Sequence, residues 1–520
     1  MKKLTAILLA LLMLCSMVPA LAEYSEDDLM EVTVATWLMD ESFLEKNDPI
    51  YEMVQKKFGI KIKPISMTWV GYAESVGTWM ATGDMPDVFT FDGFSGSSNM
   101  LESVYTWIDD GLLRPLPEDF RAKYPNLAAR FDDPIVQLTE TDGRYWAIPR
   151  YRGDSSGNTW ATNRATYYRK DWAEKLGFDK IETYDDFVAF ARAVKADESL
   201  GTLFPICGSA DNLQWYLFPT FEEELFGWWQ VNEKGMYRAF NSEHTYDAAK
   251  AIRELYNEGL IDPDILVKAN TTQYYDDFAS GKAAILCGSQ MFSLDSNLWD
   301  KMVGLNPDST LEEMVGVIPM LPNVYDGTRY CYNFWNTYWA ETFVTTNVDD
   351  EKYERIMAFL DYTSSEEWLN LYFNGVEGVD FEMVDGQVKY LTEDGERPDI
   401  MTEYAFLNGI NELTLLYEGP KFAVLTTKYD YVAKMFTDIH NLCLDYTPIP
   451  ITTANLLINT EADEGFVDTS SELVRNYMFG GDTSDPAEAW AALQQQLIDD
   501  GVIANMEAKV EAARELGRIE

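Results

Sequence analysis

Tryptophan side chains near strand ends and in polar, irregular segments are the residues of this sequence whose chemistry best suits ligand binding. The chain has 15 Trp, 30 Tyr and 27 Phe, and rings at helical positions are expected to pack in the core. Rings in the other positions include Trp37, Trp146, Trp335 and Trp339. A flat ring flanked by Asn, Asp or Arg suits a sugar, because a sugar offers an apolar CH face and a rim of hydroxyl groups. These four residues are therefore candidate ligand-stacking rings.

Sequence signatures of common enzymes are missing. His244 and His440 are the only histidines, so an HExxH zinc site is absent and a Ser-His-Asp triad has few options. The sequence also has no GxSxG, P-loop or GxGxxG motif. Paired carboxylates could cleave a glycoside, but no spacing marks such a pair among the 87 acidic residues. We therefore expect a protein that is not an enzyme and that uses no metal or cofactor.

The elements that position the candidate rings follow from the hydrophobic periodicity. Strands are expected over 31–37, 60–65 and 87–91, and helices over 50–58 and 72–82. This β-α-β-α-β order predicts an α/β fold with a parallel sheet and covering helices. Ligands of such sheets bind beyond the carboxyl ends of the strands, and this rule places Trp37 and Asp92 at a ligand site.

The charge balance excludes one class of partner and favours a soluble monomer. The chain of 520 residues has 40 Lys and Arg against 87 Asp and Glu, which gives a formal net charge of −47. Nucleic acid is excluded as a partner, because binding phosphate requires a basic surface. The hydrophobic fraction of 47% predicts a well-cored globular protein, which its charge would keep soluble and monomeric by self-repulsion.

The first 22 residues have the pattern of a secretory signal peptide. A basic start precedes an apolar run over 4–14, and cleavage is expected after Ala22. Cys15 follows that run, but the bulky Leu14 before it disfavours cleavage and lipid anchoring at this cysteine. We therefore expect a secreted protein that is extracellular or associated with the cell envelope.

The other cysteines give no sign of a metal or redox site. They are Cys207, Cys287, Cys331 and Cys443. They lie far apart in the sequence and form no CxxC pair. Buried free thiols are therefore favoured over disulfides.

Five short segments together carry a family resemblance. They are ATGDMPD (81–87), DGRYWAIP (142–149), YRKDWAEKLG (168–177), FASGKAA (278–284) and NGVEGVDFE (374–382). Each segment is weak alone, but the five in this order resemble family 1 extracellular solute-binding proteins of bacterial ABC importers. The resemblance is strongest to the long LplA-like branch of that family.

The resemblance implies a bilobal, periplasmic-binding-protein-like fold of type II, with two α/β lobes joined by hinge crossings. It implies the following division of the chain: signal peptide 1–22; N-terminal lobe 23–165 plus 335–400; C-terminal lobe 166–320 plus 405–520; hinge crossings 321–334 and 401–404.

The resemblance also implies a function. Family members bind mostly oligosaccharides, so the chain is expected to capture an oligosaccharide between its lobes and to deliver it to the permease of an ABC importer. Carried over by position, the ligand-binding residues are Trp37, Asp92, Trp146, Trp335 and Trp339. The four Trp would be stacking rings, and Asp92 would accept hydrogen bonds from hydroxyl groups.

Two alternatives stay open at this point. The same fold could bind a peptide or another small solute, and a cationic solute could exploit the acid excess. The chain could also be a secreted enzyme that cleaves glycans, although it has no recognisable catalytic pair. Recovery of the bound glycan intact would distinguish binding from cleavage.

Overall fold

The computed structural model describes residues 24–519 with gaps. The residues in this span that lie outside the description are 38, 40, 46–47, 69–70, 96–97, 153–163, 222–226, 228, 233–234, 241–243, 269–272, 292–293, 335–337, 385–386, 393–396, 417–426, 453–465, 516 and 518. The predicted signal segment 1–22, including Cys15, therefore lies outside the described residues. Among the described helices, none is long and apolar enough to cross a membrane.

The chain divides into two compact units. Unit 1 comprises residues 1–153 and 336–417, and unit 2 comprises residues 154–335 and 418–520. These limits differ from the predicted lobe boundaries because two of the segments near them pair or pack within one unit. Strand β11 (Tyr330–Phe334) fills part of the predicted crossing 321–334 but pairs with strand β16 (Thr447–Thr452) of unit 2. Helix α19 (Ile400–Glu403) fills the predicted crossing 401–404 but packs on helices of unit 1.

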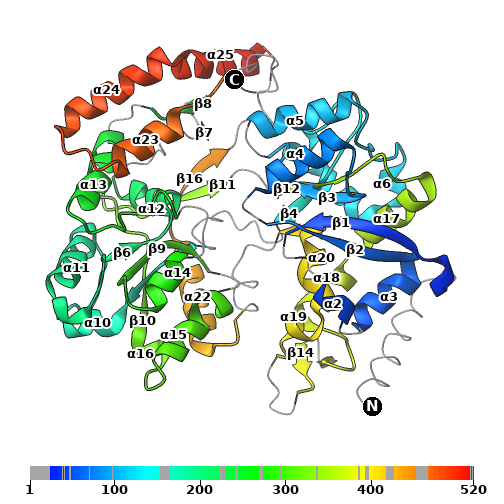
Figure 1. Cartoon of the computed structure of the whole chain (residues 1–520), viewed down its shortest axis with the longest axis horizontal. Coiled ribbons are helices and arrows are strands. Elements are labelled where there is room, and N and C mark those ends of the chain that lie inside the picture. The colour runs from blue at the N-terminus through cyan, green and yellow to red at the C-terminus, as the bar shows by residue number, and fades with distance from the viewer. Residues whose placement is uncertain are drawn as a thin grey trace. The chain divides into compact units, whose positions relative to one another are not determined.

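Unit 1 is built on one six-stranded sheet (Figure 1). In spatial order the strands are β15 (Leu415–Leu416), β4 (Ile148–Arg152), β12 (Tyr338–Val344), β3 (Val88–Phe91), β1 (Met30–Thr36) and β2 (Ile60–Ser66). Strand β1 pairs in parallel with both β2 and β3, which confirms the predicted parallel β-α-β-α-β unit. Strand β12 is antiparallel to β3 on one side and to β4 on the other, so β4 runs in the same direction as β3.

Helices cover this sheet, and several begin at predicted positions. The main helical elements of unit 1 are α3 (Pro49–Phe58), α4 (Tyr72–Thr82), α5 (Ser98–Asp109), α17 (Asp350–Tyr362), α18 (Glu366–Asn374), α20 (Ala405–Ile410) and the 3-10 turn η6 (Asn411–Leu413). Asp48 caps α3, because its side chain accepts hydrogen bonds from the backbone N–H groups of Ile50 and Tyr51. A hairpin of β13 (Phe381–Val384) and β14 (Gln387–Tyr390) completes the unit.

The two faces of the unit 1 sheet differ in chemistry. On one face Phe89 stacks on Phe343 with ring centroids 5.3 Å apart. On the other face, neighbouring strands carry threonines at paired register positions instead of aromatic rings. Thr90 donates a hydrogen bond to Thr36 between their side-chain oxygens (3.0 Å), and the hydroxyl of Thr342 donates to a carbonyl of η6 (2.6 Å). The Thr342 bond fixes η6 against the sheet.

Unit 2 contains two four-stranded sheets. Their orders are β10 (Val315–Ile318), β5 (Arg164–Arg169), β9 (Ile285–Gln290), β6 (Ile206–Cys207) in the first sheet and β11, β16, β7 (Trp229–Asn232), β8 (Gly235–Arg238) in the second. The principal helices are α11 (Tyr184–Ala196), α12 (Ala210–Leu217), α13 (Thr245–Asn257), α14 (Gln273–Ala279), α22 (Asp430–Cys443), α23 (Ser470–Phe479), α24 (Pro486–Asp499) and α25 (Val502–Glu515). Strand β5 starts before the predicted lobe boundary at residue 165 and pairs entirely within this unit.

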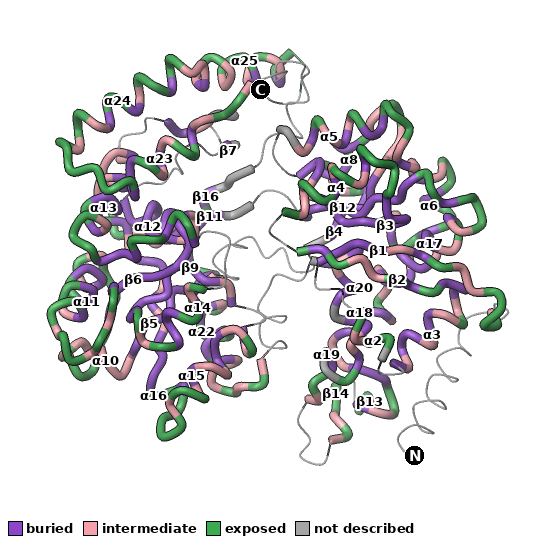
Figure 2. Tube along the Cα trace, viewed as in Figure 1, coloured by how far each residue is buried: buried purple, intermediate pink, exposed green. Residues whose placement is uncertain are grey.

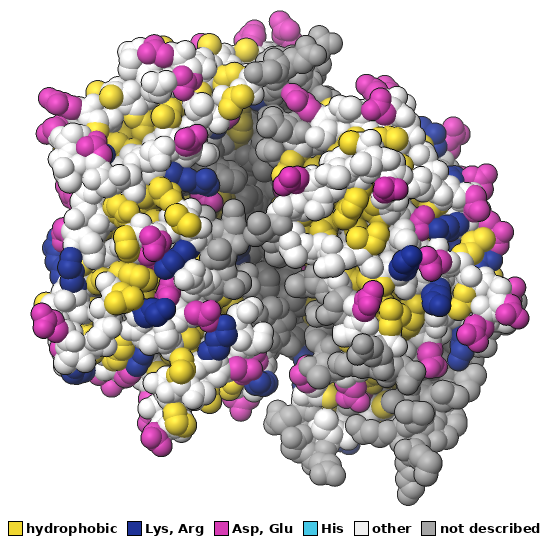
Figure 3. All heavy atoms as spheres, in the orientation of Figure 1, with side chains coloured by type: hydrophobic (Ala, Val, Ile, Leu, Met, Phe, Trp, Pro, Cys, Tyr) yellow, Lys and Arg dark blue, Asp and Glu magenta, His cyan; other side chains and the backbone are white. Residues whose placement is uncertain are grey.

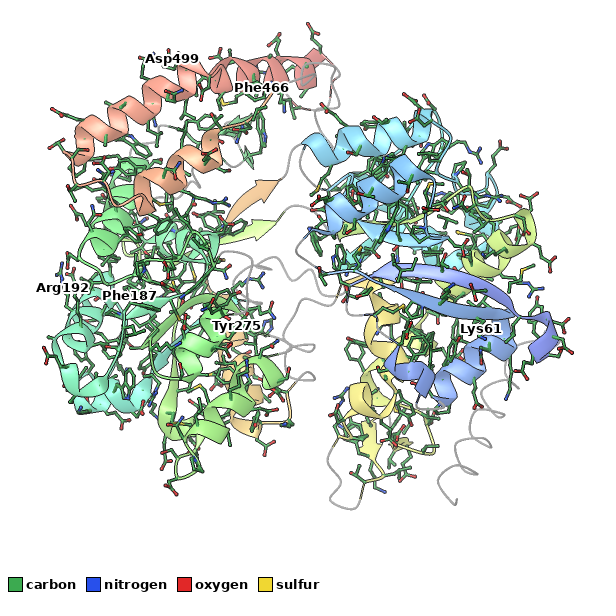
Figure 4. All side chains as sticks on the ribbon, in the orientation of Figure 1. Lys61, Phe187, Arg192, Tyr275, Phe466 and Asp499 are labelled. Atoms are coloured by element: carbon green, nitrogen blue, oxygen red, sulfur yellow. The ribbon has the colours of Figure 1, made fainter. Side chains whose placement is uncertain are left out.

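Helix α11 illustrates how these helices pack. Its N-terminus is a capping box in which the Thr183 hydroxyl accepts from the backbone N–H of Asp186. Phe187 lies toward the interior and is fully buried, whereas Arg192 lies on the outer side and pairs with Glu258 (Figure 4). Figure 2 shows the same pattern for most helices, with buried inner faces and exposed outer faces. Burial of these apolar faces is the main stabilising contribution in such a fold.

The cysteines of unit 2 belong to its core. Cys207, Cys287 and Cys331 are free and buried, and Cys443 is buried in the same cluster. Burial raises the pKa of the Cys331 thiol to about 12, which leaves it protonated and unreactive near neutral pH.

Helix α20 lies so close to the chain segment after β1 that there is no room for a side chain at the point of contact. A Cβ atom built on Gly409 would lie 2.4 Å from the backbone Cα of Met39. Glycine is therefore required at this position, because a backbone atom cannot move aside as a flexible side chain can. The contact sets the distance between the helix that leads into η6 and the segment that follows Trp37.

We predict that Gly409→Ala lowers the free energy of unfolding by about 2 kcal/mol, because the added methyl group overpacks this contact. The matched control is Gly77→Ala in α4, where a Cβ meets nothing within 4 Å. This control should raise stability by up to about 1 kcal/mol through helix propensity. Urea-induced unfolding measures both values, and a stabilised Gly409→Ala protein would contradict the close approach.

Candidate functional site

One edge of the unit 1 sheet gathers side chains from distant parts of the sequence. Trp37 directly follows β1 and Asp92 directly follows β3, so both lie at the carboxyl ends of parallel strands. Arg150 is the middle residue of β4, which runs in the same direction, and its guanidinium group reaches Trp37 and Trp339 at this edge. Trp339 lies near the start of β12 and reaches the same edge because β12 is antiparallel to its neighbours. This is the edge at which α/β sheets bind ligands.

Two of the predicted rings stack on each other at this edge. The ring centroids of Trp37 and Trp339 are 5.3 Å apart, with an interplanar angle of 21°. Tyr72 of α4 contacts Trp37 edge-on at 5.2 Å. Trp37 is 1% exposed, whereas Trp339 is only partly buried. Of the two rings, Trp339 is therefore the one with surface left to offer a ligand, and Trp37 supports it.

A buried guanidinium group lies against the stacked rings. The Arg150 Cζ atom lies 4.9 Å from the ring centroid of Trp37 and 5.3 Å from that of Trp339. Cations over indole rings are attracted by the negative ring face. The Arg150 side chain has no exposed surface, and it forms an ion pair with Glu412 of η6, whose side chain is 19% exposed. The ion pair compensates a charge that would otherwise be costly to bury.

Asp92 is oriented by two hydrogen bonds. The indole Nε1–H of Trp339 donates to Asp92 Oδ2 (3.1 Å), and the Ser95 hydroxyl donates to Asp92 Oδ1 (2.6 Å). Asp92 is partly exposed. A carboxylate can accept several hydrogen bonds, which suits it to accept from the hydroxyl groups of a ligand. The part-exposed ring of Trp339 and the carboxylate of Asp92 thus form a ring-and-acceptor pair.

The structure does not bring all five predicted residues together. Trp37, Asp92 and Trp339 form one cluster. Trp146 precedes β4, so it lies near the amino end of a strand whose carboxyl end forms the site, and its indole N–H donates to the Thr141 carbonyl (3.1 Å). Strand direction therefore places Trp146 away from the described rings of this cluster. Trp335 lies outside the described residues.

Sequence reasoning missed three charged residues at this edge, namely Arg150, Glu341 and Glu412. Arg150 and Glu341 stand within apolar strand segments, IPRYR (148–152) and YWAETFV (338–344). A charge inside a strand that is otherwise expected to be buried was the signal available for both. Glu412 had no comparable signal, because only the packing of η6 brings it to Arg150.

The cluster suits recognition better than catalysis or metal binding. Its polar groups are oriented by protein partners, and its largest side chains are aromatic. Within the described part of the chain, no group of three or more His, Cys, Asp or Glu side chains could hold a metal ion. Of the two histidines, His244 stacks on Tyr325 in unit 2, at a ring centroid distance of 3.7 Å.

We predict that Glu412→Gln lowers the free energy of unfolding by about 3 kcal/mol, because it leaves the buried Arg150 charge without its carboxylate. The matched control is Glu382→Gln in the hairpin, where Glu382 pairs with Lys389 and the side chains are 44% and 64% exposed. That exposed pair should contribute less than about 1 kcal/mol. Urea unfolding of both variants tests the difference, and equal losses would contradict the role of the buried pair.

Several curated proteins are similar to this chain over much of its length. Lipoprotein LipO of Bacillus subtilis is 25% identical over 373 residues, which cover 68% of each chain. The polygalacturonan/rhamnogalacturonan-binding protein YtcQ of Bacillus subtilis is 23% identical over 381 residues, 70% of each chain. The fructooligosaccharide ABC transporter substrate-binding protein FusA of Streptococcus pneumoniae is 25% identical over 264 residues, 45% of this chain and 46% of FusA.

Solved structures share the fold. The alginate-binding protein AlgQ2, determined without calcium ion, matches with a TM-score of 0.68 and 16% identity over 95% of this chain and all of AlgQ2. FusA of Streptococcus pneumoniae in complex with kestose matches with a TM-score of 0.63 and 18% identity, covering 94% of this chain and 99% of FusA. These likenesses confirm the predicted bilobal, periplasmic-binding-protein-like fold.

A family model gives the relationship directly. The model of the bacterial extracellular solute-binding proteins matches residues 42–369, which are more than half of the chain. The match includes the segments that hold Asp92, Arg150 and Trp339. The protein therefore belongs to the family of bacterial extracellular solute-binding proteins.

Proposed function

We propose that this protein is the solute-binding component of an ABC importer and that it captures an oligosaccharide for delivery to a membrane permease. The observation that carries the proposal is the pairing of the part-exposed Trp339 ring with the Asp92 carboxylate at the ligand edge of the unit 1 sheet. An indole can stack on the apolar face of a sugar ring while a carboxylate accepts from its hydroxyl groups. The names of FusA and YtcQ, which specify glycans, support the same class of ligand.

The roles of the site residues form part of the proposal. Trp339 is the stacking ring, Asp92 is the hydroxyl acceptor, and Trp37 supports Trp339 from the buried side. Trp335, which stands between β11 and β12 in the sequence, stays a predicted ligand contact. Trp146 is proposed as a residue of the turn before β4 rather than as a ligand contact.

The acid excess is spread over the visible surface rather than gathered in one patch. Figure 3 shows Asp and Glu side chains spread over the visible surface of both units, with Lys and Arg among them. Dispersed surface charge promotes solubility and gives no local preference for a cationic ligand. This distribution gives no support to a cationic peptide or polyamine as the ligand, although the shared fold could accommodate either of them.

The location proposed is extracellular, with residues 1–22 removed as a signal peptide. The basic start, the apolar run and the expected cleavage after Ala22 support this location. LipO, a lipoprotein by name, is similar over 68% of the chain, but the context of Cys15 differs from that of an acylated cysteine.

A thermal-shift screen of the chain from Glu23 onward tests the ligand class. The panel contains kestose, pectic oligosaccharides, chitin oligosaccharide and maltose, with peptides and polyamines as rival ligands. A ligand at one hundred times its dissociation constant stabilises a protein by about 2.7 kcal/mol, so a binder gives a clear rise in Tm. We expect a rise with one glycan series. Rises with peptides or polyamines alone would overturn the sugar assignment, and release of shortened glycan would indicate an enzyme.

We predict that Trp339→Ala weakens the affinity for that glycan roughly 30-fold, the equivalent of about 2 kcal/mol for a truncated aromatic anchor. Trp146→Ala removes a half-buried Trp from the same unit and should leave affinity unchanged. Isothermal titration calorimetry on folded protein measures both. An equal loss in the two variants would show that stability rather than contact explains the effect.

A further inference from the structure

Three consecutive residues of β12 all bind the loop that carries Asp92. The indole of Trp339 donates to Asp92, and the backbone N–H of Ala340 donates to the Ser95 hydroxyl (2.8 Å). Glu341 then accepts from three successive backbone N–H groups. Its Oε2 accepts from Gly93 (2.9 Å) and Phe94 (3.1 Å), and its Oε1 accepts from the Ser95 N–H (3.1 Å).

A β-bulge in β12 allows these three consecutive residues to contact the same loop. The register of β12 against β4 shifts between Tyr338 and Glu341, so one extra residue stands in β12. Ala340 adopts a positive φ of 59°, which is unfavourable for a residue with a Cβ atom. Such a conformation persists only where the surroundings hold it. Here it turns the Ala340 N–H toward Ser95.

The loop is shaped to receive the Glu341 carboxyl group. Glu341 is 1% exposed, and Ser95 is equally buried. A Cβ atom on Gly93 would lie 2.5 Å from the Val104 side chain and 3.4 Å from Glu341 Oε2. Glycine at this position therefore lets the backbone N–H reach the carboxyl oxygen. Loss of the carboxyl group would leave three buried N–H groups without this acceptor, which is costly.

We infer that Glu341 is a positioning residue of the ligand site, whose carboxyl group holds the 93–95 backbone and thereby fixes Asp92 beside Trp339. The connection runs through Ser95, which binds Glu341 with its backbone and Asp92 with its hydroxyl. The part of this inference that concerns ligand affinity rests on the proposed function. The part that concerns the loop and the stacked rings does not.

The charges around Glu341 make the inference testable by pH. Burial raises the pKa of Glu341 to about 8, the negative charge of Asp92 adds to this rise, and the N–H bonds oppose it. Tyr72 of α4 and Tyr338 of β12 also face this group, and the pKa of each is raised chiefly by burial.

The sign of the effect follows from proton binding. Between about pH 4.5 and about pH 8 the folded protein keeps a proton on Glu341 that the unfolded chain releases, so stability falls as pH rises through this range. Glu341→Gln is neutral at every pH and lacks this dependence. Its Tm relative to the parent protein should therefore rise by roughly 5 °C between about pH 5 and about pH 9.

The matched control for the titration is Glu377→Gln, which changes an exposed carboxylate of the same unit. Its Tm difference from the parent protein should stay constant over the same range of pH. A Glu341→Gln difference that also stays constant would show that the carboxyl group does not carry the proton in the folded protein.

Positioning is tested by the exciton-coupled circular dichroism of the stacked indoles and by glycan affinity. Glu341→Ala should reduce the signal that Trp339→Phe identifies as belonging to the Trp37–Trp339 stack. It should also weaken binding of the best glycan of the panel roughly tenfold. Glu341→Gln keeps an oxygen that can accept from Gly93 and Phe94, so this variant should retain most of the dichroism signal and most of the glycan affinity. If Glu341→Ala does not fold, Ser95→Ala breaks the same connection and should reduce the same signal.

The outcomes separate the two proposals. If no glycan binds the parent protein, the proposed function fails, while the dichroism and the pH profile still decide the role of Glu341. If a glycan binds and Glu341→Ala, or Ser95→Ala in its place, leaves both dichroism and affinity unchanged, Glu341 is not a positioning residue and the proposed function stands.

Discussion

Burial of ionisable side chains is the constraint on which the candidate site depends. Such a side chain inside a sheet requires an opposite charge or several hydrogen bonds, and unit 1 meets this requirement twice along one edge. Arg150 is compensated by Glu412, and Glu341 by three backbone N–H groups. Each compensation ties the sheet to a segment distant in sequence. The edge therefore has one favoured arrangement, since any other would leave a buried polar group unsatisfied.

In that arrangement the aromatic and charged side chains have different roles. Trp37 and Arg150 are buried and form the base on which Trp339 lies. Trp339 and Asp92 keep partial exposure and are joined by a hydrogen bond. A ring and a carboxylate held in this way lose little conformational freedom when a ligand binds, which favours affinity. Preorganisation of this kind fits a protein whose family binds solutes.

Much of the local structure could be predicted because it depends on neighbouring residues. The three predicted strands and two predicted helices between β1 and β3 begin and end within one residue of their expected limits, since hydrophobic periodicity and capping by Asp48 and Gly59 act locally. The short helix α2 (Ser42–Glu45) was not predicted. The lobe boundaries were less accurate, because they depend on which strands pair. The resemblance placed a hinge crossing around residue 402, but this segment forms α19 and packs within unit 1.

The sequence by itself determined the α/β class, the parallel arrangement of the first three strands and the position of Trp37 and Asp92 at their carboxyl ends. Only the tertiary structure decided which rings meet. In the tertiary structure Trp339 stacks on Trp37, whereas Trp146 lies before the amino end of β4. The same packing pairs Glu412 with Arg150 and places Glu341 against the 93–95 backbone. The physical reason is that strand direction, a bulge and charge compensation join residues far apart in the chain, and such pairings leave no periodic signal in the sequence.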